Sequence, residues 1–172
     1  MYLYNEVKHA SERLGTLDQI ITKIQTEPSR IVTADGQIIY SVSEEYRKPV
    51  RLQEVPQIVR KAILAAEDKR FYDHPGVDVW ALGRTLRENV RERRSAQGGS
   101  TLTMQLAKRL FTNTRKTLQR KVDDIALALA LEQRLTKDQI LELYMNQVYF
   151  GEGATGIKAA AEAYLNKPLD KL

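Results

Sequence analysis

The segment from about Leu118 to Leu135 constrains the fold more than any other part of the chain. It has the length of a helix, and between Ile125 and Leu131 it is apolar on nearly every side. A helix without a polar face has to be buried, so other helices must cover it. The sequence therefore predicts a helical domain built around this segment.

Asp124 is unusual within this segment, because it shares a face with Leu127 and Leu131 and is therefore predicted to point inward. Arg120 and Lys121 precede it by four and three residues, which is close enough for ion pairs along a helix. An ordinary ion pair of this kind contributes little to stability. The inward orientation favours a functional role for Asp124.

Other segments show the periodicity of amphipathic helices, and the sequence predicts a mainly α fold. Ser100 is expected to cap one helix, and a capping box at Thr136–Gln139 opens another that continues to Gly151. The helices expected around the central segment are 56–72, 78–94, 100–112, 136–151 and 159–165.

The first 52 residues read differently. Residues 11–27 predict a short amphipathic helix, and the run RIVTADGQIIY around Asp35-Gly36 predicts a β-hairpin. We therefore divide the chain into a lead-in at 1–52 and a helical domain at 53–172.

Composition excludes several kinds of site. The 172 residues include no cysteine and only two histidines, which excludes disulfides and thiolate chemistry and argues against a multi-histidine metal site. A net charge of +5 favours anionic partners. No apolar run approaches the roughly 20 residues that span a bilayer, and the first residues do not read as a signal peptide. If the protein works at a membrane, we expect its anchor to lie outside this chain.

The stretch AILAAEDKRFYDHPG, residues 62–76, places Glu67 at the edge of an apolar stripe. A carboxylate with apolar neighbours has a raised pKa and can exchange protons near neutrality. Taken by itself, the stretch favours a simpler interpretation, in which Glu67 is solvated and paired with Lys69 or Arg70. The stripe itself consists of Val55, Val59, Ile63 and Ala66.

Two carboxylates on separate helices, Glu67 and Asp124, are suited to acid–base chemistry. A Gly-rich link at 95–99 precedes Ser100 and Thr101, and a helix that begins there offers backbone N–H groups to an anion. Cations in the same region would stabilise a departing phosphate or diphosphate. These cations are Lys108, Lys116, Arg120 and Lys121.

The expected helix at 78–94 has Trp80 near its start and an arginine-rich face. Such a helix can lie in a membrane interface. It can equally be a basic surface helix packed on the core, and the sequence alone leaves both interpretations open.

Four segments resemble, in order and spacing, the peptidoglycan glycosyltransferases of glycosyltransferase family fifty-one. This family comprises the transglycosylase domains of class A penicillin-binding proteins and the monofunctional transglycosylases. The resemblance covers roughly Pro49 to Leu172. The segments are EDKRFYDHPGVD, GGSTLTMQLAKRL, RKVDDIALALALE and TKDQILELYMNQVYFGEGATGIKAAAEAYLNK.

The resemblance implies a lysozyme-like helical fold with a head lobe and a smaller jaw that contacts the membrane through residues 78–94. It implies that lipid II and the growing glycan strand are the substrates. The implied reaction forms β-1,4-linked strands with inversion and releases undecaprenyl diphosphate, for cell wall synthesis and cell shape. It places the protein at the extracytoplasmic face of the bacterial cell membrane. A fused transpeptidase domain outside this chain is an expected partner, and nucleic acid is not.

The resemblance also assigns roles to residues. Glu67 matches the general base that acts on the acceptor sugar's 4-hydroxyl, and Asp68, Phe71, His74 and Gly76 match the rest of its motif. Lys116, Arg120 and Lys121 match cations against the diphosphate. A divalent metal, Mg²⁺ or Mn²⁺, is expected to assist, with Asp124 as a possible ligand, and no organic cofactor is expected. The residues expected to line the donor cleft are Gly99, Ser100, Thr101, Gln105 and Lys108.

Two departures stand out. The family's Arg-Lys-x-x-Glu motif ends here in Asp124, which is one methylene shorter and could draw back from the diphosphate. The chain also ends at Leu172, where we expect further helices to complete the domain. Two alternatives to the synthetic enzyme stay open: a lysozyme-like enzyme that cleaves glycan, and a basic helical module that binds membrane or nucleic acid.

Overall fold

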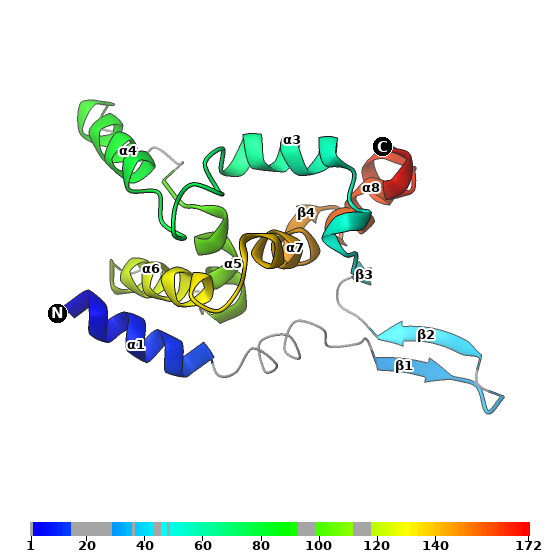
Figure 1. Cartoon of the computed structure of the whole chain (residues 1–172). Coiled ribbons are helices and arrows are strands. Elements are labelled where there is room, and N and C mark those ends of the chain that lie inside the picture. Colours follow the sequence, from blue (N-terminus) through cyan, green and yellow to red (C-terminus); the bar gives the residue numbers. More distant parts are fainter. Residues whose placement is uncertain are drawn as a thin grey trace.

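The computed structural model describes residues 2–14, 29–35, 37–42, 46–47, 49–92, 99–111 and 118–172. These residues are mainly helical, which confirms the predicted fold class and agrees with a lysozyme-like helical domain (Figure 1). The sheets are small: one of two strands and one of three.

The centre of the domain is α6, Leu118–Glu132, which packs against α5, Leu102–Phe111, and α7, Lys137–Gln147. The predicted burial of the apolar segment is confirmed. Burying such side chains contributes about 1.5–3 kcal/mol each, so these three helices carry most of the core's hydrophobic stabilisation. Their side chains with less than 2% exposure include Leu102, Leu106, Leu127, Leu131, Ile140, Leu141 and Met145.

The predicted capping box of α7 is confirmed. Thr136 Oγ1 accepts the backbone N–H of Gln139 at 3.3 Å, and Gln139 Oε1 accepts the backbone N–H of Thr136 at 2.8 Å. The helix ends at Gln147 rather than at Gly151, because residues 149–151 join a sheet.

That sheet was not predicted. Its central strand is β5, Ala154–Thr155, which pairs in parallel with β3, Tyr46–Arg47, and antiparallel with β4, Tyr149–Gly151. The chain then forms α8, Ile157–Leu165, two residues longer at its start than predicted, and the short 3₁₀ helix η2, Leu169–Lys171.

The N-terminal helix α1, Tyr2–Leu14, packs along α6. Ala10 is buried in the main core, and Arg134 Nη2 donates to the carbonyl and hydroxyl oxygens of Ser11, both at 2.7 Å. The helix predicted over 11–27 therefore has the wrong start, and residues 15–27 of that prediction lie outside the described part of the chain. The division of the chain at residue 52 stays a prediction.

The predicted hairpin is confirmed. Strands β1, Ser29–Val32, and β2, Ile38–Val42, pair antiparallel, and Figure 1 shows them extending away from the helices.

The segment before α3 is fixed on α7. Asn146 forms two hydrogen bonds of 2.8 Å with the backbone of Val50, one with its N–H and one with its carbonyl. Glu142 Oε2 accepts the N–H of Leu52 at 2.6 Å, where the 3₁₀ helix η1, Leu52–Glu54, begins. These bonds set the position from which α3, Gln57–Glu67, starts.

Helix α3 ends at Glu67, although the periodicity predicted a helix to Tyr72. Asp68 leaves the helical conformation with φ −160° and ψ 81°. The predicted apolar stripe is also only partly correct: Val59 and Ile63 pack against the core, whereas Ala66 is exposed.

Helix α4, Val79–Glu92, begins after Asp78, whose Oδ1 accepts the N–H of Ala81 at 2.9 Å. This agrees with the start predicted at Asp78, whereas residues 93 and 94 of that prediction are not among the described residues. Among the described helices, none combines the length and apolarity needed to cross a membrane.

Candidate active site

One cleft of about 1010 Å³ lies between the end of α3, the loop that follows it, α4 and the start of α5. It brings together residues that are far apart in the sequence, from Ala65 to Lys121. The predicted site residues that line it are Glu67, Asp68, Gly99, Ser100, Thr101, Gln105, Lys108 and Lys121.

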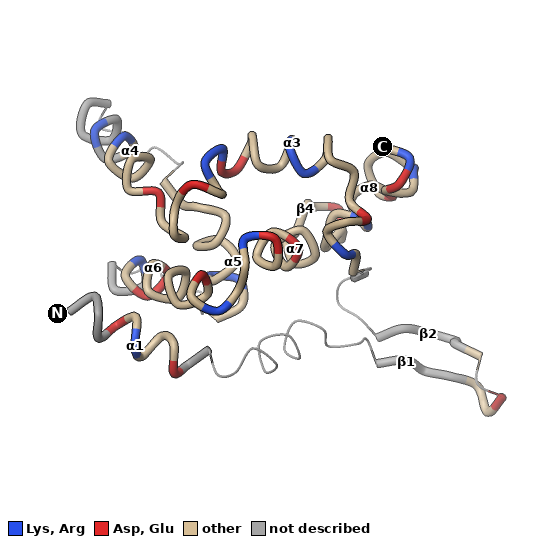
Figure 2. The backbone as a smooth tube through the Cα atoms, in the orientation of Figure 1, with Lys and Arg blue, Asp and Glu red and all other residues tan. Residues whose placement is uncertain are grey.

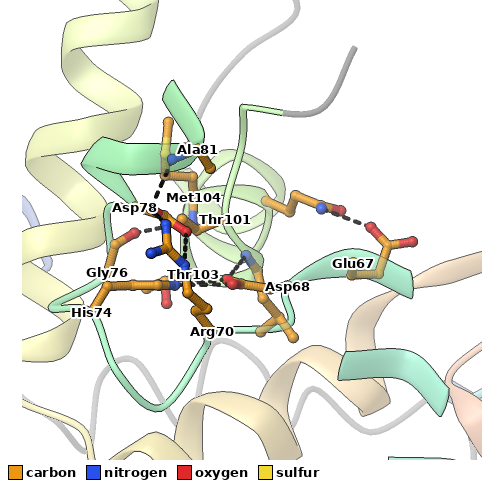
Figure 3. A network of polar contacts seen from close by, with 12 residues as sticks. Glu67, Asp68, Arg70, His74, Gly76, Asp78, Ala81, Thr101, Thr103 and Met104 are labelled. Atoms are coloured by element: carbon orange, nitrogen blue, oxygen red, sulfur yellow. Dashed lines mark hydrogen bonds and ion pairs between the residues drawn. The ribbon is translucent and has the colours of Figure 1, made fainter. Parts of the chain in front are cut away.

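Glu67 is the last residue of α3 and is exposed at the cleft. Gln105 Nε2 donates a hydrogen bond to its Oε2 at 2.9 Å (Figure 3). Glu67 does not have the expected apolar surroundings, because it is exposed in an open cleft and accepts a hydrogen bond from the polar Gln105 amide. Of the simpler interpretation, the solvent exposure of Glu67 at the helix end is confirmed, whereas the pairing with Arg70 is not, because Arg70 pairs with Asp78.

Asp68 explains why α3 ends at Glu67. Its buried carboxylate lies 3.0 Å from His74 Nε2 through both oxygens and accepts the backbone N–H of Leu102 at 3.0 Å (Figure 3). A buried carboxylate is stable only when such partners are present. This residue therefore joins the end of α3 to the start of α5.

Thr101, rather than the predicted Ser100, caps α5. Its Oγ1 accepts the N–H of Met104 at 3.2 Å and donates to the carbonyl of Gly76. Gly76 has φ +88°, and a Cβ there would lie 2.8 Å from Glu132 Cγ, so a larger residue would force the loop away from α6.

The contacts of two polar side chains near this loop, Lys137 and Thr103, were not predicted from the sequence. Lys137 Nζ donates to Glu132 Oε1 at 2.8 Å and to the carbonyl of His74 at 2.6 Å, and it lies 4.4 Å from the ring centroid of Phe71. Thr103 Oγ1 donates to the same Glu132 oxygen at 2.6 Å. Lys137 stands in the capping segment that the sequence analysis quoted, but its spacing gave no sign of these contacts.

Arg70 and Asp78 close the far side of the loop. Arg70 Nε donates to Asp78 Oδ2 at 3.0 Å, and Arg70 Nη2 pairs with Oδ1. Burial opposes ionisation of Asp78, but the hydrogen bonds from Arg70 and from the Ala81 N–H outweigh it and hold the pKa of this carboxyl below its usual value.

Cations line the cleft on both sides. Lys121 Nζ donates to Ser100 Oγ at 2.9 Å and shares the cleft with Lys108. Lys116 and the side chain of Arg120 lie outside the described residues. Figure 2 shows further basic residues in the loop after α3 and on α4, which the sequence analysis did not assign to the site. The cleft-lining residues among these are Lys69, Arg70 and Arg84.

Gly99 lies where the chain approaches α4. A Cβ at this position would lie 3.2 Å from Leu82 Cδ2 and 3.4 Å from Thr85 Oγ1. The absence of a side chain therefore lets the backbone at Gly99 lie close to the side chains of α4.

Asp124 is buried, with 5% exposure, so the predicted inward orientation is confirmed. It is not among the described residues that line the cleft. Within the described residues, no three His, Asp or Glu side chains gather closely enough to hold a metal ion. The described residues therefore do not by themselves supply three protein ligands to one metal ion. The expected Mg²⁺ or Mn²⁺ stays a prediction from the resemblance.

Comparison with known proteins decides the family. Residues 35–172 match the family described as Transglycosylase. The chain belongs to the transglycosylase family. This confirms the family resemblance and, with it, the expected class of enzyme, a transglycosylase.

Curated relatives of this transglycosylase chain are penicillin-binding proteins. It is 43% identical to penicillin-binding protein 1F of Bacillus subtilis over 144 residues, which cover 84% of this chain and 20% of the relative. It is 42% identical to penicillin-binding protein 1A of Neisseria gonorrhoeae over 155 residues, which cover 90% of this chain and 19% of the relative. The chain therefore spans about a fifth of the length of these relatives.

Proposed function

We propose that this transglycosylase chain polymerises lipid II into β-1,4-linked glycan strands with release of undecaprenyl diphosphate. The observation that carries the proposal is the shared cleft, in which the Glu67 carboxylate and the Lys108 and Lys121 side chains face the same space. A base and a cation cluster in one cleft are what a displacement at a sugar carbon with a diphosphate leaving group requires.

In the proposed reaction, Glu67 takes the proton of the acceptor sugar's 4-hydroxyl. The hydroxyl oxygen forms a bond to the anomeric carbon of the donor as the bond from that carbon to the diphosphate oxygen breaks. The bonding electron pair leaves with the diphosphate. Because the displacement is single and the two oxygens lie on opposite faces, the anomeric configuration inverts.

The departing diphosphate is assigned to the part of the cleft beside Ser100. Lys121 is already oriented there by its hydrogen bond to Ser100, and Lys108 lies one turn beyond Gln105 on α5. These ammonium groups compensate the charge that develops on the leaving group, so no general acid is needed on that side. Lys116 and Arg120 keep the same proposed role from the sequence.

The membrane contact is assigned to α4. At its start Val79 and Trp80 are 74% and 81% exposed, and Arg84 and Arg87 are exposed further along. An apolar and aromatic end beside arginines suits the surface of an anionic bilayer. We place the protein at the extracytoplasmic face of the cell membrane, where lipid II and the growing strand are its partners, alongside a possible fused transpeptidase domain.

Incubation with labelled lipid II tests the proposal. We expect glycan products of increasing length on a gel. Separate reactions are run with and without added Mg²⁺ or Mn²⁺. Chelation with EDTA measures the contribution of a divalent metal. Finished glycan strands serve as the second substrate. Cleavage of those strands without growth on lipid II would overturn the proposal in favour of a glycan-cleaving enzyme.

A further inference from the structure

Tyr144 on α7 belongs to a chain of hydrogen bonds that reaches Glu67. It is buried, with 5% exposure, and sequence analysis would class it as a core residue. Its hydroxyl donates to Gln105 Oε1 at 3.3 Å, and Gln105 Nε2 donates to Glu67 Oε2 at 2.9 Å. Three side chains from α7, α5 and α3 are thus linked in series.

The chemistry of these groups gives the chain a direction. A glutamine amide has one accepting end and one donating end, and an ionised carboxylate only accepts. With the Tyr144 hydroxyl donating to Oε1, the NH₂ end of Gln105 faces Glu67. The reversed amide would place two oxygens against each other at the carboxylate. Tyr144 therefore favours the orientation in which Gln105 holds the ionised base.

The Tyr144 hydroxyl stays a donor over the whole neutral range. Burial raises the pKa of Tyr144 to about 12, and the negative charge of Glu67 adds to this effect, opposed by Arg109. The phenol therefore keeps the proton that it donates to Gln105.

We propose that Tyr144 is a positioning residue: it fixes the Gln105 amide, which holds Glu67 Oε2 and leaves Oε1 directed to the acceptor hydroxyl. This inference rests on the proposed function, in which Glu67 is the base. A base held in one orientation is in the reactive geometry for a larger fraction of the time. Loss of the Tyr144 hydroxyl should therefore lower kcat and leave KM nearly unchanged.

A double-mutant cycle tests the series arrangement. Tyr144→Phe removes the hydroxyl and keeps the ring in the core, and Gln105→Met removes the amide at similar length. We expect Tyr144→Phe to lower kcat for lipid II by about 3- to 10-fold, the range that one hydrogen bond accounts for, with KM changed by less than about 2-fold. In the Gln105→Met background the same change should have no further effect, because the hydroxyl acts only through the amide.

A matched control is Tyr164→Phe, which removes a surface hydroxyl that donates to the Phe150 carbonyl outside the cleft. Its kcat should equal that of the parent chain. An equal loss from Tyr144→Phe in both backgrounds, or no loss in either, would overturn the proposal. Absence of polymerisation by the parent chain would instead refute the proposed function itself.

An NMR measurement gives a readout besides activity. In the parent chain the two side-chain N–H signals of Gln105 should differ widely in chemical shift and exchange slowly with solvent. In Tyr144→Phe the difference in chemical shift should become smaller and the exchange faster. Signals that are unchanged by Tyr144→Phe would show that the hydroxyl does not fix the amide, and would contradict the proposal.

Discussion

The Asp68 carboxylate accepts the backbone N–H of Leu102 at 3.0 Å, which ties the residue after Glu67 to the first residue of α5. The same carboxylate contacts His74 through both oxygens. Because both partners are buried, water does not readily replace them. The relative position of Glu67 and the helix that carries Gln105 is therefore set by Asp68.

Replacing Asp68 with asparagine should lower the free energy of unfolding by about 2 kcal/mol, because one accepting oxygen becomes an NH₂ group and leaves a buried donor without its bond. Urea unfolding at neutral pH measures this loss. Asp73→Asn, an exposed change in the same loop, is the control and should lie within about 0.5 kcal/mol of the parent. Equal stability of the two variants would show that the bonds from Asp68 to Leu102 and His74 do not stabilise the fold.

Glu67→Gln should reduce the rate of lipid II polymerisation by about 10²- to 10⁴-fold, the usual contribution of a general base. Stability should hardly change, because the side chain is exposed at the helix end. The rate is measured by gel analysis of labelled products. Glu162→Gln, an exposed change on α8, should retain the parent rate. Normal polymerisation by Glu67→Gln would exclude its assignment as the base.

Asp78→Asn keeps a side chain that can cap α4 but removes the charge that pairs with Arg70. Since the folded-state pKa of Asp78 is lowered, its contribution is complete above about pH 4, near the ordinary value, and is lost as pH falls through the folded-state pKa. We expect the variant to be about 1–2 kcal/mol less stable at pH 7. In urea unfolding at a series of pH values, this difference should shrink below pH 4. A constant difference would contradict the ionic contribution.

Trp80 is the only tryptophan in the chain, so selectively excited tryptophan fluorescence reports on the start of α4 alone. On vesicles that contain anionic lipid, its emission should shift to shorter wavelength as the ring leaves water. Arg84→Gln and Arg87→Gln should each weaken binding by about 5-fold at low salt. Zwitterionic vesicles are the control. Unchanged emission on anionic vesicles would remove α4 from the proposed membrane surface.

Asp124 tests whether a shortened carboxylate replaces the family's glutamate. We predict that Asp124→Glu preserves or raises polymerisation and that Asp124→Ala lowers it. Because Asp124 is buried, the alanine variant is also expected to lose stability, and rates have to be compared at temperatures where both variants are folded. Full activity of the alanine variant would mean that the cations alone stabilise the departing diphosphate.

The parts of the fold that depend on local pattern were predictable. The hairpin around Asp35 and the capping box at Thr136 are formed by neighbouring residues, so short sequence signals suffice. The burial of α6 follows from its composition alone.

The parts that depend on distant partners were not predictable. Helix α3 ends at Glu67 because Asp68 bonds to Leu102, which is 34 residues further along, and nothing near residue 68 indicates this. The pairing of β3 with β5 and the contacts of Lys137 with the loop after α3 also join residues that are distant in the sequence. In the site, the motif resemblance supplied Glu67 and Gln105, whereas the direction of the Gln105 amide required the position of Tyr144.

Helix α3 has no fully buried residue, yet it carries the proposed base. Its two ends are both held by α7: Asn146 and Glu142 bind the segment before its first residue, and Tyr144 reaches its last residue through Gln105. Contacts with α7 thus fix the positions of both ends of α3. Changes on its exposed surface, such as Ile58, Lys61 or Ala62, leave both sets of contacts in place, so this surface can vary without moving Glu67.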